Sequence, residues 1–262
     1  MAWHVNNGIG IHWREDGPSD AQPIVFLNSL GTDLRLWDGV VSALDTSYRC
    51  VRIDTRGHGL SDAPSGPYKL EELTSDIETL VQQLDLEEIT LVGVSLGGMM
   101  AQRLAANMPN RIARAVYSNT AARMGTPKLW ADRIESVQRC DLDGIADTIL
   151  DRWFGADFRH SKDISYWRNM LLRTPTHGYM GCCHALAQAD LTNSVVTLRA
   201  PALVIAGSED GASPPDVVES LASALPIARF DVLDKLGHLP MAEQPATFSR
   251  LVLEFIEDTA HA

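Results

Sequence analysis

The segment Gly93-Val94-Ser95-Leu96-Gly97 has the residue types and spacing of a serine nucleophile turn. A serine that attacks a carbonyl carbon must stand clear of its surroundings on a sharp turn between a strand and a helix. An apolar run at 89–92 precedes this segment, and a helical stretch follows from Met99. We therefore expect Ser95 to be the nucleophile, with side chains at 93 and 97 excluded by neighbouring backbone. The alternative is an inert serine in a glycine-rich turn.

A serine hydroxyl is a weak nucleophile unless a base accepts its proton. His238 follows a strand-like run at 230–233 and precedes the last predicted helix. Asp210 follows the strand-like run at 202–206. Loops at the carboxyl ends of parallel strands meet at one edge of a sheet, where doubly wound folds place their sites. We expect His238 to be the base and Asp210 the acid that orients it, in the chain order Ser, Asp, His.

Two other residues compete for these roles. His58 lies in Asp54-Thr55-Arg56-Gly57-His58-Gly59, a turn that is more typical of a loop-shaping segment than of a catalytic base. Glu209 precedes Asp210 and would be the orienting acid if Asp210 were not.

A tetrahedral intermediate also needs donors for its oxyanion. The amide of Leu96 would lie at the N-terminus of the helix that follows Ser95, where negative charge is stabilised. The loop after the apolar run at 24–27 reads Asn28-Ser29-Leu30-Gly31. By position, the amide of Leu30 is the expected second donor.

The elements that must position these residues alternate along the chain. Continuous apolar runs, unlike alternating ones, indicate strands buried on both faces of a parallel sheet. Such runs occupy 24–27, 50–53, 89–94, 113–117 and 202–206. Apolar stripes with helical spacing lie between and after them, at 70–84, 101–108 and 248–256. A hairpin is predicted around Asn6-Asn7-Gly8. This alternation predicts a doubly wound α/β sheet.

The alternation stops between Thr120 and Ala189. This stretch reads as helices only, at 129–137, 142–154, 164–172 and 180–187. We expect a core of residues 1–119 and 190–262, with 120–189 as a helical cap or lid inserted into it. The insertion has nine Lys or Arg and eight Asp or Glu, whereas the remainder has 13 and 26. A relatively basic lid on an acidic body favours an anionic small molecule; ordinary mixed surface charge is the alternative.

Composition excludes several functional classes. The 262 residues are 45% hydrophobic and 21% charged, as in ordinary globular proteins. A formal charge of -12 argues against nucleic-acid binding, which needs clustered Lys and Arg. No apolar run approaches the roughly 20 residues of a membrane span. The first residues do not resemble a signal peptide, and the four cysteines form no C-x-x-C pair. We expect a cytoplasmic protein with reduced thiols and no metal site.

Beyond these patterns, the chain resembles the α/β-hydrolase superfamily and, within it, the 3-oxoadipate enol-lactone hydrolases. The segments that carry the resemblance are Asn28–Thr32 with Trp37-Asp38, Asp54–Gly59, Gly93–Met99, Gly178-Tyr179, Ala187–Asp190, Ile205–Asp210 and Gly237–Leu239. Most members of the superfamily have His-Gly where this chain has Asn28-Ser29, a departure typical of the enol-lactonase group. The resemblance implies a mostly parallel eight-stranded sheet flanked by helices, with the lid inserted after the sixth strand.

The resemblance also implies a reaction. The enzyme would be a carboxylic ester hydrolase that opens 3-oxoadipate enol-lactone, an anionic small molecule, in the β-ketoadipate pathway of aromatic degradation. Ser95, His238 and Asp210 would act through an acyl-enzyme, with no metal or organic cofactor. Arg133 would bind the substrate carboxylate, with Arg159, Arg168 and Arg173 as rivals. Trp130, Trp153 and Trp167 could wall the pocket, and Trp130 is the expected substrate contact.

Other functions could use the same residues. A carboxylesterase, a C–C bond hydrolase or a perhydrolase could use the same triad. A non-catalytic small-molecule receptor on this fold would belong to a different functional class. The number of subunits is left open by the sequence.

Overall fold

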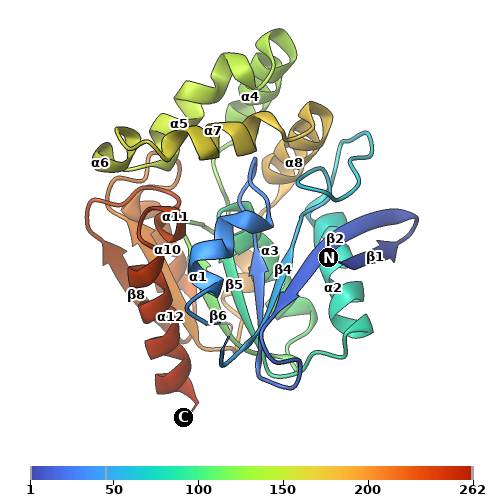
Figure 1. Ribbon diagram of the computed structural model, residues 1–262, viewed down its shortest axis with the longest axis vertical. Coiled ribbons are helices and arrows are strands. Elements are labelled where there is room, and N and C mark those ends of the chain that lie inside the picture. The colour runs from blue at the N-terminus through green and yellow to red at the C-terminus, as the bar shows by residue number, and fades with distance from the viewer. Residues whose placement is uncertain (1, 45, 261–262) are drawn as a thin grey trace.

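One eight-stranded sheet forms the centre of the computed structural model, which describes residues 2–44 and 46–260 (Figure 1). The strand order is β1-β2-β4-β3-β5-β6-β7-β8. β1 and β2 pair antiparallel with their neighbours, and all other pairs are parallel. The strands are β1 Ala2–Asn6, β2 Ile9–Asp16, β3 Pro23–Leu27, β4 Arg49–Ile53, β5 Ile89–Val94, β6 Ile112–Ser118, β7 Ala202–Gly207 and β8 Ala228–Leu233. The predicted α/β-hydrolase sheet is confirmed.

Burial explains why the continuous apolar runs became the inner strands. Every residue of β3, β5 and β7 is buried, whereas the edge strand β8 has no buried residue. The predicted hairpin joins β1 to β2, with Asn7 at φ 50° and Gly8 at φ 82°. Positive φ at both central residues is the requirement of a two-residue hairpin turn whose twist matches that of its strands.

Helices cover both faces of the sheet. In Figure 1, α1 and α12 lie together in front of the strands and α3 lies behind them. The elements outside the stretch between β6 and β7 are η1 Leu34–Trp37, α1 Asp38–Val41, α2 Leu70–Gln83, α3 Leu96–Asn107, α10 Pro215–Ala224, α11 Pro240–Glu243 and α12 Pro245–Thr259. No helix is predicted from the sequence at α10, where the apolar stripe is short and only Val218 and Leu221 are buried.

Between β6 and β7 the described chain contains helices and no strand. They are α4 Pro127–Cys140, η2 Asp143–Ile145, α5 Ala146–Trp153, α6 Ala156–Arg159, α7 Ile164–Leu172, α8 Thr176–Gln188 and α9 Thr192–Val195. The helix expected at 142–154 is divided into η2 and α5, and the one-turn helices α6 and α9 were not predicted. Figure 1 shows α4 to α8 as a layer above the sheet, and we call these five helices the helical layer.

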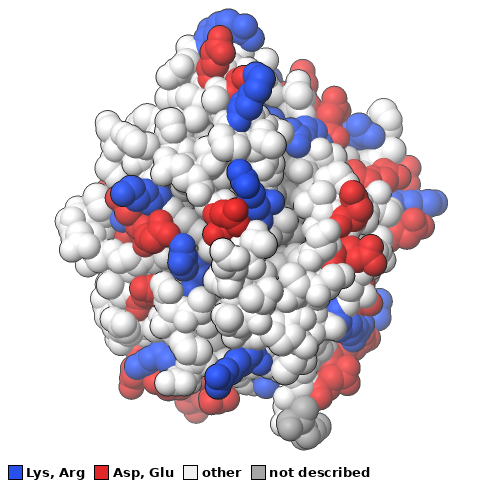
Figure 2. All heavy atoms as spheres, turned by 180° about the vertical axis from the view of Figure 1, so that it is seen from behind, with Lys and Arg blue, Asp and Glu red and all other residues white. Residues whose placement is uncertain are grey.

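Surface charge is mixed on the face seen in Figure 2. Basic and acidic side chains are interspersed there and are not gathered by sign. In the helical layer, Lys128 lies 2.8 Å from Asp132 and Arg168 lies 2.7 Å from Asp143. These two of the nine basic side chains of residues 120–189 are therefore paired with acids of the same stretch at its surface.

Asn28 fixes the loop that leaves β3. Its side chain is fully buried, its Nδ2 donates to the Ile53 carbonyl at 2.7 Å, and its Oδ1 accepts from Trp37 Nε1 at 2.8 Å. The Trp37 ring in turn packs between Phe26 and Phe248, at centroid distances of 5.1 and 6.0 Å. Asn28 thus joins β3, β4 and η1 through two satisfied hydrogen bonds, which explains an amide at this position.

We expect Asn28→Ala to lower the free energy of unfolding by about 2–5 kcal/mol, because a buried carbonyl and a buried indole N–H lose their partners. Urea denaturation measures this change. Asn107→Ala is the matched control, because that side chain is exposed at the end of α3, and it should change stability by less than about 0.5 kcal/mol. Equal effects of the two substitutions would contradict the proposed role of the Asn28 bonds.

Candidate active site

Ser95 lies at the tip of the β5–α3 connection in a strained conformation. Its φ of 57° and ψ of -119° are rarely adopted by residues with a side chain. The surrounding backbone holds it there: Ser95 N donates to Ser118 O at 3.0 Å, and Ser95 O accepts from Thr120 Oγ1 at 2.8 Å. Strain of this kind persists only where neighbouring structure enforces it, and it is frequent at functional sites.

The two glycines of the serine turn are required by close backbone contacts. A Cβ at Gly93 would lie 2.3 Å from the Gly97 carbonyl oxygen, and a Cβ at Gly97 would lie 2.2 Å from the Leu27 carbonyl oxygen. Both distances are far below van der Waals contact. The expectation that side chains at 93 and 97 would collide with backbone is confirmed.

His238 and Asp210 are in contact, as their positions after two strands of the sheet predict. His238 Nδ1 lies 2.8 Å from Asp210 Oδ2, and both side chains are buried. Burial by itself raises the pKa of Asp210, but the attraction of His238 and the hydrogen bonds to the carboxylate outweigh burial, so that this pKa is lowered. An ionised carboxylate can only accept hydrogen bonds, so Nδ1 of His238 is the donor in this contact.

Asp210 has further partners that the sequence analysis missed. Its Oδ2 also accepts from Asn119 Nδ2 at 2.9 Å and from Ser213 Oγ at 2.8 Å. Its Oδ1 accepts from the backbone N–H groups of Ala212 and Ser213 at 2.6 and 2.9 Å. The spacing of Ser213, three residues after an aspartate, is a signal that could have identified it, because aspartate often binds backbone N–H groups two and three residues ahead. Asn119 has no comparable local signal.

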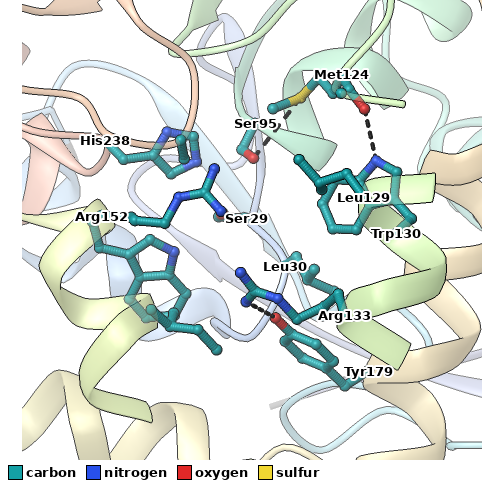
Figure 3. A pocket seen from close by; sticks show the side chains of 14 residues that line it. Ser29, Leu30, Ser95, Met124, Leu129, Trp130, Arg133, Arg152, Tyr179 and His238 are labelled. Carbon is teal, nitrogen blue, oxygen red and sulfur yellow. Dashed lines mark hydrogen bonds between the residues drawn. The ribbon is translucent and has the colours of Figure 1, made fainter. Parts of the chain in front are cut away.

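Ser95 and His238 line one cavity together with Leu30 (Figure 3). Within the described residues, the Ser95 hydroxyl makes its hydrogen bond to Met124 Sδ at 4.0 Å, not to His238. Catalytic hydrogen bonds are often loose without substrate and tighten in the reacting complex. Ser95 and His238 thus border one cavity, although no hydrogen bond joins their side chains.

The loop that carries Leu30 is fixed by His58. Gly31 N donates to His58 Nε2 at 2.9 Å, and Gly31 has a φ of 81° that favours glycine. Burial lowers the pKa of His58 to about 4, so the ring is neutral and can accept this bond. His58 thus positions the loop of the expected oxyanion donor. Leu96, the other expected donor, is the first residue of α3, whose N–H has no acceptor within the helix.

Two arginines face the cavity without a carboxylate partner. Arg133 Nη1 donates to Tyr179 Oη at 3.2 Å, and Arg152 Nε donates to the Gly211 carbonyl at 2.8 Å. Across residues 2–44 and 46–260, no ion pair involves either guanidinium. Burial first, and then the positive charge of Arg133, lower the pKa of Arg152. Sequence reasoning proposed Arg133 and missed Arg152, which is brought to the cavity by the fold alone.

Of the other arginines and tryptophans proposed from the sequence, two tryptophans line the cavity and the three arginines do not. Arg159 and Arg168 pair with acids of the helical layer, and Arg173 is exposed. Trp130 and Trp153 line the cavity, with Trp130 Nε1 donating to the Met124 carbonyl at 2.7 Å. Trp167 packs against Phe154, with ring centroids 5.9 Å apart.

The described residues form neither a metal-binding cluster nor a membrane-spanning helix. They contain no group of three or more His, Cys, Asp or Glu side chains placed to hold a metal ion. None of the helices they form has the length and apolar character needed to cross a membrane.

Comparisons with known proteins agree with this architecture. The model of the alpha/beta hydrolase family matches residues 24–251. The chain is 34% identical to 3-oxoadipate enol-lactonase 1 of Acinetobacter baylyi over 244 residues, covering 92% of this chain and 91% of that protein. It is 32% identical to 3-oxoadipate enol-lactonase 2 of the same organism over 246 residues, covering 93% and 92%. The crystal structure of the enol-lactonase from Burkholderia xenovorans LB400 superimposes with a TM-score of 0.94, at 37% identity, covering 98% of this chain and 100% of that one.

The neutral, buried His58 predicts a pH-dependent loss of stability. Because its pKa is about 4 in the folded protein and 6.5 unperturbed, the unfolded chain takes up a proton first as pH falls. The contribution of His58 to the free energy of unfolding is therefore fully present above pH 6.5. It is lost as pH falls from 6.5 to 4, a decrease of about 3 kcal/mol. We expect His58→Gln to lose correspondingly less stability over that range in urea denaturation. The exposed His160→Gln should follow the native protein, and identical pH slopes for all three would refute this assignment.

Proposed function

Since this chain belongs to the alpha/beta hydrolase family, we propose that it hydrolyses 3-oxoadipate enol-lactone to 3-oxoadipate through an acyl-enzyme formed on Ser95. The single observation that carries this proposal is a cavity that holds Ser95, His238 and two guanidinium groups without carboxylate partners. The similarity to proteins named 3-oxoadipate enol-lactonases supports the choice of substrate.

The arginines of this cavity differ from the buried Arg56, which has a carboxylate partner; the buried Arg114 also has only a neutral acceptor, Thr90, but it does not line the cavity. The buried Arg56 donates from Nε and Nη2 to both carboxylate oxygens of Asp76 at 2.7 Å. Buried charges normally have such partners, because desolvation without one is costly. Arg133 and Arg152 have only neutral acceptors. A substrate carboxylate would complete their pairing, and the enol-lactone carries one on its acetate arm.

The proposed first half of the reaction opens the ring. Ser95 Oγ attacks the lactone carbonyl carbon while His238 Nε2 takes the hydroxyl proton. Asp210 holds the resulting imidazolium, and the Leu30 and Leu96 amides stabilise the oxyanion. The bond between carbonyl carbon and ring oxygen then breaks, and His238 protonates the departing enolate oxygen. The enol becomes a ketone, and the acyl group stays on Ser95.

The second half releases the product. His238 takes a proton from water, whose oxygen attacks the acyl carbon. The ester bond to Ser95 breaks, His238 returns the proton to Oγ, and 3-oxoadipate leaves with a new carboxyl group, which then loses its proton to solvent. In this proposal residues 120–189 act as the lid that supplies Arg133, Arg152 and Trp130 to the cavity. We propose a cytoplasmic enzyme of aromatic degradation, in keeping with the buried thiols of Cys182 and Cys183.

We expect Ser95→Ala to lower kcat for the enol-lactone by about 10³-fold or more, because the nucleophile is lost. The decrease in ultraviolet absorbance of the lactone measures turnover, and a simple aryl ester is assayed in parallel. Efficient lactone turnover with weak ester hydrolysis is the expected result. Ester hydrolysis without lactone turnover would keep the triad and reject the proposed substrate.

Arg133→Met should lower kcat/KM for the lactone by about 10- to 100-fold, the effect of losing one charge-assisted contact. Arg152→Met should act in the same direction. Neither substitution should affect a lactone whose carboxylate arm is methylated. Lys128→Met on the outer face of α4 is the matched control and should leave kcat/KM within twofold. An equal loss on both lactones would show that the arginines shape the cavity and do not bind the carboxylate.

A further inference from the structure

Glu243 connects the helical layer to the segment 234–239, which carries His238 and which we call the histidine loop. It is the last residue of α11, five residues after His238. Its Oε1 accepts from Gly237 N at 2.7 Å, and its Oε2 accepts from Gly155 N at 3.1 Å. Gly237 immediately precedes His238, and Gly155 lies just after α5. We propose that Glu243 is a positioning residue, which holds His238 in register with the cavity wall formed by the helical layer.

The contact between the two segments is closely packed backbone. Leu239 N donates to the Trp153 carbonyl at 3.2 Å. The residues on both sides of His238, Gly237 and Leu239, therefore each donate a backbone hydrogen bond. A Cβ at Gly237 would lie 2.6 Å from the Trp153 carbonyl oxygen, and one at Gly155 would lie 2.3 Å from the Lys235 carbonyl oxygen. The same stretch of chain presents Arg152 and Trp153 to the cavity. A shift of this stretch therefore moves His238 and the substrate-facing wall together.

A second carboxylate acts beside Glu243 but reaches only one of the two segments by its side chain. Glu209 Oε2 accepts from Ala156 N at 2.6 Å. The side chains of Glu209 and Glu243 thus bind successive N–H groups of the helical layer, and Glu243 alone of these two also binds the histidine loop. This difference makes Glu209 the natural comparison for Glu243.

The ionisation of Glu243 falls near neutral pH. Burial raises its pKa to about 7; repulsion from Glu209 and Asp210 acts in the same direction, and the N–H groups of Gly237 and Gly155 oppose it. The segments packed against it also carry Arg152, Lys235 and His238. A carboxylate accepts both N–H bonds more strongly than a neutral acid does. The connection therefore tightens as pH rises through about 7.

Glu243→Gln is the informative substitution, because one of its amide termini is a donor and cannot accept from a backbone N–H. The role proposed here rests on the catalytic function proposed for Ser95 and His238, but not on the identity of the lactone. Two readouts are therefore used across pH 5.5 to 8.5: lactone turnover, and the rate at which a fluorophosphonate probe labels Ser95.

We expect Glu243→Gln to lower both kcat and the labelling rate by about tenfold at pH 8, with KM changed less than about twofold. The ratio of native to variant rates should rise with pH between about 6 and 8, as Glu243 ionises. Glu209→Gln keeps both N–H bonds of Glu243, so in that variant this ratio should stay within about twofold of one at pH 8, where Glu243 is ionised in both proteins. Equal rates in native protein and Glu243→Gln, or a ratio independent of pH, would overturn the proposal.

Hydrogen exchange in the native protein tests the same connection without any variant. The amide protons of Gly155 and Gly237 should be protected, and their protection should increase together through pH 7. Exchange at unprotected rates would overturn the proposal even if Glu243→Gln does not fold. A native protein whose Ser95 is not labelled at all would instead reject the proposed catalytic function, while protected amides would still show the Glu243 connection.

Discussion

The backbone conformation of Ser95 is the constraint on which the rest of the site depends. A φ of 57° for a serine costs about 1–3 kcal/mol, so the surrounding structure must enforce it. That enforcement comes from fully buried β5, from the hydrogen bond to Ser118 at the end of β6, and from the approach of Gly97 to the Leu27 carbonyl of β3. Three adjacent parallel strands are thus needed to present one hydroxyl. The parallel sheet and the backbone conformation of the proposed nucleophile are parts of one arrangement.

The charged side chains on the two sides of the cavity have different kinds of hydrogen-bond partner. On the core side, Asp210 is surrounded by donors from three segments, so that its charge is satisfied although it is buried. On the side of the helical layer, Arg133 and Arg152 have only neutral acceptors. An orienting acid must keep its charge throughout a reaction, whereas a binding arginine must keep its charge available for the substrate. The two environments match these different requirements.

The core and the helical layer are held in relative position by contacts at the boundary between them. Glycines at 155 and 237 allow the backbones to approach, and the carboxylate of Glu243 binds one N–H group from each side. A site assembled from two layers needs such a connection, because small displacements of a catalytic group have large effects on rate. Here a single side chain links the segment of the proposed base, His238, to the segment that presents Arg152 and Trp153 to the cavity.

The local structure and the chain order of the proposed catalytic residues could be predicted from the sequence. The glycine spacing around Ser95, the apolar runs of the inner strands and the turn at Asn7-Gly8 are short-range patterns, and each predicts the conformation of a contiguous segment. Placing His238 and Asp210 after strands was enough to predict their meeting, because parallel strands end at one edge. Other contacts depend on tertiary packing. It gives Arg152 only a neutral acceptor, places Asn119 against Asp210 and makes the connection through Glu243. The contacts of Asn119 and Glu243 join residues 91 and 88 positions apart, and such distances depend on how layers pack, which no local periodicity encodes.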